Sequence, residues 1–150
     1  MSDEDYIERW ETIAGVDIKA LVNTRSPDDL RRIAARAAVA SAEYRELDEE
    51  LVLRAIELLR AEGADSDLQE ELTDLAEQID ELAWDKQDEV DAGTADYAEY
   101  QSLFRRARAV AALAFALDED VRANAPEALY EAYQALDQDD TELNAIIAQS

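Results

Sequence analysis

Two pairs of carboxylates are the residues of this chain whose types and spacing could support chemistry. Glu46 and Glu49 lie three positions apart, as do Glu71 and Asp74. Carboxylate oxygens are the ligands that Mg²⁺ prefers, so two such pairs on neighbouring helices could hold a divalent ion. The chain contains no His and no Cys. This absence excludes Ser–His and Cys–His nucleophiles and zinc bound by imidazole or thiolate.

The acidic pairs resemble those of the all-α nucleotide pyrophosphohydrolases, in which paired acids on antiparallel helices hold Mg²⁺. The resemblance implies a Mg-dependent nucleotide hydrolase. Acids make up 38 of 150 residues, however, so this spacing recurs along the chain. Glu46 and Glu49 also flank a helix start expected at Asp48, so their side chains are not expected to point toward the same metal ion. We therefore expect no enzyme, catalytic residue, metal or cofactor, and keep the hydrolase as an alternative.

The charge of the chain points to its milieu. Against the 38 acids stand only 14 Lys and Arg, a formal net charge of -24. Self-repulsion of this size destabilises a compact chain, and salt relieves it because the Debye length falls to about 3 Å near 1 M. Arg outnumbers Lys twelve to two, and 29 residues are Ala. These biases favour a halophilic organism or its virus, with an acidic protein of a GC-rich genome as the alternative.

The sequence also bears on location. The first residues show no basic region followed by an apolar one, as a signal peptide would. No apolar run approaches 18 residues, the length expected of a membrane span. We expect a cytoplasmic protein without membrane contact, or a virion component if the source is viral.

Helix boundaries are predicted by the few Pro and Gly residues and their neighbours. Ser26 followed by Pro27 is a typical helix start, and Asp48 is expected to cap a second helix that ends at Gly63. The remaining expected boundaries are a capping box of Ser66 with Gln69, an end at Gly93, starts at Thr94 and Pro126, and a last cap at Asp140 or Thr141.

The apolar residues between these boundaries recur at helical spacing, and no segment alternates with a period of two. The fold class is therefore all-α, an irregular multi-helix bundle or a short stack of helical hairpins with seven or eight helices. We expect one domain over residues 1–150. Its parts are an N-terminal helical segment (1–25, with an apolar face of Tyr6, Ile7, Trp10 and Ile13), a helical hairpin (26–63), a long acidic helix (64–93) and a helical hairpin with a short C-terminal helix (94–150).

A leucine seam runs along the long acidic helix. Its members step by four, three, four and three residues, so they face one partner helix in the same chain or in a second copy. The leucine seam consists of Leu68, Leu72, Leu75, Ile79 and Leu82.

Residues 107–129 resemble one unit of the HEAT-type helical repeats. They read as an Ala- and Leu-rich helix, a short Asp-rich turn, Val121-Arg122 and a second helix of the same kind. A weaker self-similarity aligns residues 30–61 with 104–135. The resemblance implies stacked helical hairpins and a protein-binding role. The segment 66–90 departs from the family because it is longer and more like a coiled coil, and an irregular bundle is the alternative.

Acidic residues concentrate on the long helix. Residues 64–102 hold fourteen acids and one Lys. An acidic ridge roughly opposite the leucine seam is either a solvated face or a partner-binding surface. Trp84, beside the leucine seam, is either a core-edge residue or an anchor for a partner. The candidate partner-binding residues are Glu70, Asp74, Glu77, Glu81, Trp84 and Asp88.

Residues 103–117 contain three Arg and no acid. A chain of this net charge repels polyanions at long range, so we expect no direct nucleic-acid contact. We expect six arginines to pair with acids of neighbouring helices. They are Arg105, Arg106, Arg108, Arg31, Arg32 and Arg36.

The function expected from these features is a non-enzymatic protein–protein interaction or assembly subunit. Its partner would be a protein, and this includes a second copy of the chain bound through the Leu68–Leu82 seam. The alternative is an acidic inhibitor, immunity protein or nucleic-acid mimic that binds a basic partner, since electrostatics speeds and orients such association.

Overall fold

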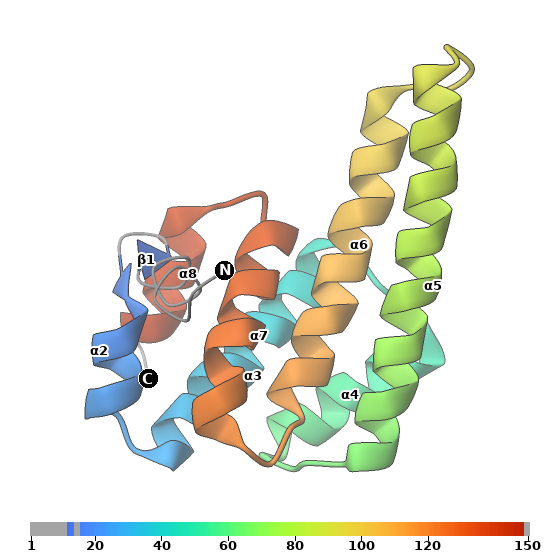
Figure 1. Cartoon of the computed structure of the whole chain (residues 1–150). Helices are drawn as coiled ribbons and strands as arrows, with labels where there is room; N and C mark the ends of the chain where they lie inside the picture. The colour runs from blue at the N-terminus through green and yellow to red at the C-terminus, as the bar shows by residue number, and fades with distance from the viewer. Residues whose placement is uncertain (1–11, 14–15, 149–150) are drawn as a thin grey trace.

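A computed structural model describes residues 12–13 and 16–148 and shows an all-α multi-helix bundle (Figure 1). Across these residues the chain forms seven helices: α2 (Ile18–Thr24), α3 (Pro27–Tyr44), α4 (Glu50–Arg60), α5 (Ser66–Asp91), α6 (Tyr97–Ala116), α7 (Val121–Ala135) and α8 (Asp140–Ala148). The predicted fold class is confirmed.

Helix α6 lies at the centre of the bundle, between α5 and α7 (Figure 1). Helix α3 packs against both α6 and α7, while α4 lies at the base beside α3, α5 and α6. Helices α2 and α8 flank the other side of the bundle. The core is therefore built by α3, α6 and α7, and α5 covers the outer side of α6.

Alanine dominates the helix faces that meet in this core. Ala37, Ala38, Ala107, Ala112 and Ala128 are all fully buried. Small side chains let helix backbones approach closely, although each buries little apolar area. Larger buried side chains fill the spaces between them, among them Leu30, Ile33, Leu72, Leu113, Leu129 and Leu143.

The helix N-termini confirm one predicted cap and correct the others. Ser26 caps α3, since its Oγ accepts from the Asp29 amide at 3.1 Å. The Asp65 side chain caps α5 in place of Ser66, because a carboxylate at this position can accept from two amides at once. Three other N-caps differ from the prediction. The structure has Glu49 where Asp48 was predicted, Asp96 where Thr94 was predicted, and Asp139 where Asp140 or Thr141 was predicted.

Pro126 does not start a helix, as the sequence suggested, but lies inside α7. The helix begins at Val121, and the Asp120 carboxylate accepts from the Ala123 amide at 3.3 Å. A proline five residues beyond the start removes one backbone hydrogen bond. The side-chain cap therefore sets the start of α7.

The end of α4 also differs from expectation. Glu62, with φ of 58°, occupies the left-handed position that was assigned to Gly63. The Glu62 amide donates to the Leu59 carbonyl and the Gly63 amide to the Leu58 carbonyl, both at 3.0 Å, which is the Schellman pattern. A Cβ at Gly63 would meet the Leu58 side chain, which would have to shift. At the end of α5, by contrast, Gly93 takes the predicted left-handed position with φ of 79°.

This assignment predicts that Glu62→Gly stabilises the protein by about 0.5–1 kcal/mol. A left-handed conformation costs a non-glycine residue roughly 1–2 kcal/mol, and the greater freedom of glycine in the unfolded chain offsets part of the gain. The free energy of unfolding from chemical denaturation measures the change. Glu57→Gly, inside α4, is the control and should cost about 1 kcal/mol. Equal losses in both variants would contradict the assigned cap.

The leucine seam packs against the bundle of its own chain, except at its C-terminal end. Leu68, Leu72 and Ile79 are buried against the bundle, and Leu75 is half-buried. Leu82, predicted to belong to the seam, is 56% exposed, and Ala83 is buried in its place. The buried stripe steps through Leu72, Ala76, Ile79 and Ala83, since a straight α-helix drifts away from a strict 3.5-residue repeat.

Ile13 lies in a strand and not in the predicted N-terminal helix. Strands β1 (Thr12–Ile13) and β2 (Val16–Asp17) form a short antiparallel pair in which Ile13 is opposite Val16. The remaining residues of that prediction, Tyr6, Ile7 and Trp10, lie outside the described residues. Residues Ile18–Thr24 form α2, so this part of the predicted N-terminal helical segment is helical.

Candidate interaction surface

The six predicted site residues form one continuous stripe along α5. Glu70, Asp74, Glu77, Glu81, Trp84 and Asp88 step by four, three, four, three and four residues, and all six are exposed. None of the five carboxylates forms an ion pair with any residue that the structure describes. The stripe is therefore a hydrated acidic surface interrupted by one indole.

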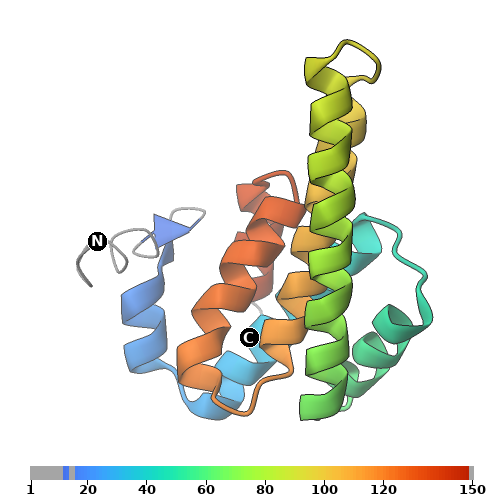
Figure 2. The same ribbon diagram turned by 45° about the vertical axis from the view of Figure 1, so that its right-hand side comes forward.

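The outer part of α5 and α6 projects beyond the rest of the bundle. Figures 1 and 2 both show the two helices and their connecting turn standing clear of the other elements. Arg105 hydrogen-bonds the Gln134 carbonyl near the end of α7, which marks the level at which α6 leaves the bundle. We call residues 82–104 the arm. It carries six acids and one Lys, a net charge of -5.

Trp84 lies on the arm and is 62% exposed, so it is not the core-edge residue that its position beside the leucine seam suggested. The reason is geometric, because at this level α5 lies beside α6 alone among the helices that the structure describes, and none of the others covers its remaining faces. Leu82 and Tyr97, also on the arm, are 56% and 57% exposed. The arm thus presents large apolar side chains to solvent, which soluble proteins rarely cluster without a binding role.

Three aromatic rings of α6 run along one side of the arm. The centroids of Tyr97 and Tyr100 are 5.7 Å apart, and those of Tyr100 and Phe104 are 6.1 Å apart. Both separations are in the favourable range for aromatic pairs. Phe104 in turn lies under the guanidinium of Arg108, 5.2 Å from its ring centroid. The rings are therefore ordered by contacts along their own helix.

Trp84 lies on the same side of the arm as these rings. Arg108 pairs with Asp80 across the α5–α6 interface. Trp84 follows Asp80 by one helical turn, and Phe104 precedes Arg108 by one turn, so both project from the same side of the antiparallel pair at the same level. We call Trp84, Tyr97, Tyr100 and Phe104 the aromatic strip.

Arg108 closes the base of the aromatic strip by joining three helices. Its guanidinium pairs with Asp80 of α5 and, at 3.1 Å, with Glu131 of α7. The side chains are only 18%, 21% and 12% exposed. Burial raises the pKa of Glu131 above its usual 4.5, and the charge and hydrogen bond of Arg108 offset only part of that rise. The cluster therefore holds two carboxylates with one partly buried cation.

This arrangement predicts that the difference in stability between Glu131→Gln and the parent protein depends on pH. Because the folded pKa of Glu131 is raised, its contribution to stability is present below the unfolded pKa and is lost as pH rises through the folded value. The stability of Glu131→Gln relative to the parent should therefore increase between about pH 4 and pH 7. Urea denaturation across this range measures the difference. Parallel stability curves would contradict the raised pKa.

Arg105 and Arg106 pair with acids of other elements, as the sequence predicted. Arg106 contacts Glu49 at 2.8 Å, and Arg105 pairs with Asp137 beyond the end of α7. Burial alone would raise the pKa of Asp137, but hydrogen bonds from Tyr44 and Arg45 and the charges of Arg45 and Arg105 outweigh it and lower that pKa. The prediction is confirmed for these residues, for Arg108, and for Arg32 with Glu62, which follows α4. It is not met by Arg31, which has no ion pair among the described residues.

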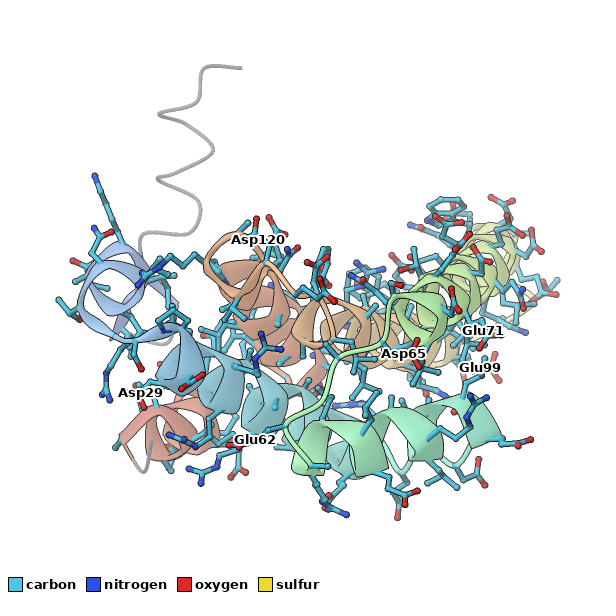
Figure 3. The ribbon with its side chains drawn as sticks, turned by 90° about the horizontal axis from the view of Figure 1, so that it is seen from below. Asp29, Glu62, Asp65, Glu71, Glu99 and Asp120 are labelled. Atoms are coloured by element: carbon cyan, nitrogen blue, oxygen red, sulfur yellow. The ribbon has the colours of Figure 1, made fainter. Side chains whose placement is uncertain are left out.

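The two acidic pairs with metal-ligand spacing do not form a cluster. Glu49 is engaged by Arg106, and Glu46 lies in the left-handed turn after α3. Glu71 and Asp74 are exposed on α5, and Figure 3 shows Glu71 on the same side of the α5–α6 pair as Glu99. Within the described part of the chain, no three acidic side chains are placed to hold a metal ion.

A groove between α3 and α4 is the feature that the sequence did not predict. Two adjoining hollows of about 230 and 210 Å³ share Ala35, Arg36, Leu59 and Arg60. Small-molecule sites typically measure about 300–1,000 Å³, so these hollows suit side chains better than a cofactor. The rim contains four arginines, Arg31, Arg32, Arg36 and Arg60, against two acids, Glu43 and Glu62. The helical spacing of Arg32 and Arg36 was a sequence signal for a basic helix face. The sequence could not show that Arg60, distant along the chain, lies beside them.

No helix among the described residues combines the length and apolar character that a membrane span requires. Comparisons of the chain with protein-family models, with curated proteins and with solved structures gave no match.

Proposed function

We propose that the protein is a non-enzymatic interaction or assembly subunit of a halophilic organism or its virus, and that the arm makes the contact. The observation that carries this proposal is the exposure of Trp84 and Tyr97 within the aromatic strip of a projecting arm. Trp and Tyr are the residue types enriched among the energetically dominant contacts of protein interfaces.

The size of the aromatic strip supports a protein partner. Buried aromatic side chains contribute about 150–250 Å² each, but Trp84 and Tyr97 are 62% and 57% exposed, and Tyr100 and Phe104 are half-buried. The strip therefore offers roughly 300–500 Å² to a partner. A standard interface buries about 800 Å² on each partner. The rest of the interface would come from other residues of the arm, which carries six acids. The complementary partner surface is therefore apolar and rimmed by Lys or Arg.

A photo-crosslinking amino acid at position 84, expressed in the source organism, tests the proposal. We expect a cross-link to a protein with such a surface, and none when the same residue replaces the exposed Arg54 of α4. With the purified partner, Trp84→Ala should weaken binding by about 2 kcal/mol, or roughly 30-fold, as hot spots do. The stability of the variant should change by less than about 0.5 kcal/mol. Equal labelling from both positions, or unchanged affinity, would contradict the proposal.

The acidic stripe supports a second candidate, an acidic inhibitor or nucleic-acid mimic. Its five carboxylates are exposed and lack ion pairs within the described chain. Association driven by this surface would slow steeply between about 0.05 and 0.5 M salt. Charge reversal at Glu70, Asp74, Glu77 and Glu81 would abolish it. Binding through the aromatic strip would instead persist at high salt.

A further inference from the structure

The groove between α3 and α4 has the chemistry that the arm requires of its partner. The floor is apolar, formed by Ala35, Val39, Ala40 and Leu59. Four arginines and two glutamates line its rim, an excess of two positive charges in a chain of net charge -24. Figure 3 shows Glu62 at the junction of the two helices.

Not all of the positive charge on this rim is neutralised within the chain. Arg32 pairs with Asp29 and Glu62, and Arg60 pairs with Glu43. Arg31 forms no ion pair among the described residues. The Arg60–Glu43 pair is highly exposed, with side chains 64% and 55% accessible. Exposed pairs of this kind contribute little to stability, so Arg60 is available to an incoming carboxylate at small cost.

We propose that this groove receives the arm of a second copy of the chain. The proposal rests on the proposed function of the arm and names its partner. Trp84 and Tyr97, the two exposed rings of the aromatic strip, would enter the two hollows, while acids beside Trp84, such as Glu81 and Asp88, meet Arg36 and Arg60 on the rim. Complementary charges of this kind set orientation and exclude wrong partners.

The contact must form between copies. Figures 1 and 2 place α4 at the base of the bundle and the turn between α5 and α6 at the opposite end, so an arm does not reach the groove of its own chain. Arm and groove are different surfaces, and each copy has one of each. Such a heterologous contact produces a closed ring or an open filament instead of a two-fold dimer.

The net charge makes this assembly dependent on salt. Two copies of charge -24 repel each other over about 10 Å at 0.1 M salt but only over about 3 Å at 1 M. Contacts between the arm and the rim are shorter than either length. Assembly should therefore be absent in dilute buffer and appear in molar KCl.

Complementation between two variants tests the proposal. Trp84→Ala with Tyr97→Ala removes the arm contact but leaves the groove. Arg36→Glu with Arg60→Glu removes the groove contact but leaves the arm, and all four positions are exposed. In about 1 M KCl, analytical ultracentrifugation should show assemblies for the parent protein and monomers for each variant alone. An equal mixture of the two variants should form a one-to-one dimer, because one intact arm and one intact groove remain.

The control variant Lys19→Glu with Arg54→Glu has the same change of charge at exposed positions outside the groove. It should assemble like the parent protein, whereas the groove variant should weaken assembly at least 100-fold. Circular dichroism checks that each variant is folded. A parent protein that stays monomeric at millimolar concentration overturns the inference, as does a mixture that forms no dimer. If the parent is monomeric while position 84 still cross-links to another protein, the proposed function holds and only self-assembly is wrong.

Discussion

Replacing Arg108 by methionine should lower the free energy of unfolding by about 3 kcal/mol, the lower end of the usual loss when one partner of a buried ion pair is removed, because the cluster is partly buried. Without the guanidinium, Asp80 and Glu131 would face each other in a site where their side chains are only 21% and 12% exposed. Arg54→Met, on the exposed side of α4, should change stability by less than about 0.5 kcal/mol. Urea denaturation in molar KCl measures both.

A triple variant separates the charge from the packing of this cluster. Asp80→Leu, Arg108→Met and Glu131→Leu together should recover most of the loss, since replacing a whole buried charge cluster by apolar residues is often neutral or stabilising. A loss below about 1 kcal/mol for Arg108→Met alone would mean that water solvates the two carboxylates in its place.

The melting temperature should rise steadily as KCl increases from about 0.1 M to above 1 M. The acidic stripe on α5 has no internal counter-charges among the described residues, so dissolved cations must screen it. Circular dichroism at the helical minimum follows the transition. A flat curve would contradict adaptation to high salt.

A neutralised variant tests whether the stripe is the source of that dependence. Glu70→Gln, Asp74→Asn, Glu77→Gln, Glu81→Gln and Asp88→Asn together change the net charge from -24 to -19. The variant should melt higher than the parent protein in dilute buffer, because self-repulsion of a highly charged chain opposes folding. The two proteins should converge at molar KCl. A constant difference at all salt concentrations would assign the effect to helix propensity instead.

Local signals in the sequence predicted the elements well but their ends less well. The Ser26 cap and the Gly93 end are correct, whereas Pro126, which gives the same kind of signal, lies inside a helix. At Asp65 and Glu62, the residue beside the expected one takes the role. Adjacent polar residues compete for the same amides, and the choice depends on how the connecting segment must turn to meet the next helix.

The composition and periodicity of the chain by themselves determined the all-α class, the long acidic helix, the acidic stripe and the pairing of the arginines of α6. These properties depend on residue types and on spacing within one helix. Only the tertiary structure decided that Leu82 and Trp84 are exposed, that α5 and α6 project as an arm, and that Arg36 and Arg60 share a groove. The physical reason is that burial depends on which helices meet. Ala-rich helices can pack closely on several faces, so the part of α5 and α6 that extends beyond α7 is set by contacts between residues distant in sequence.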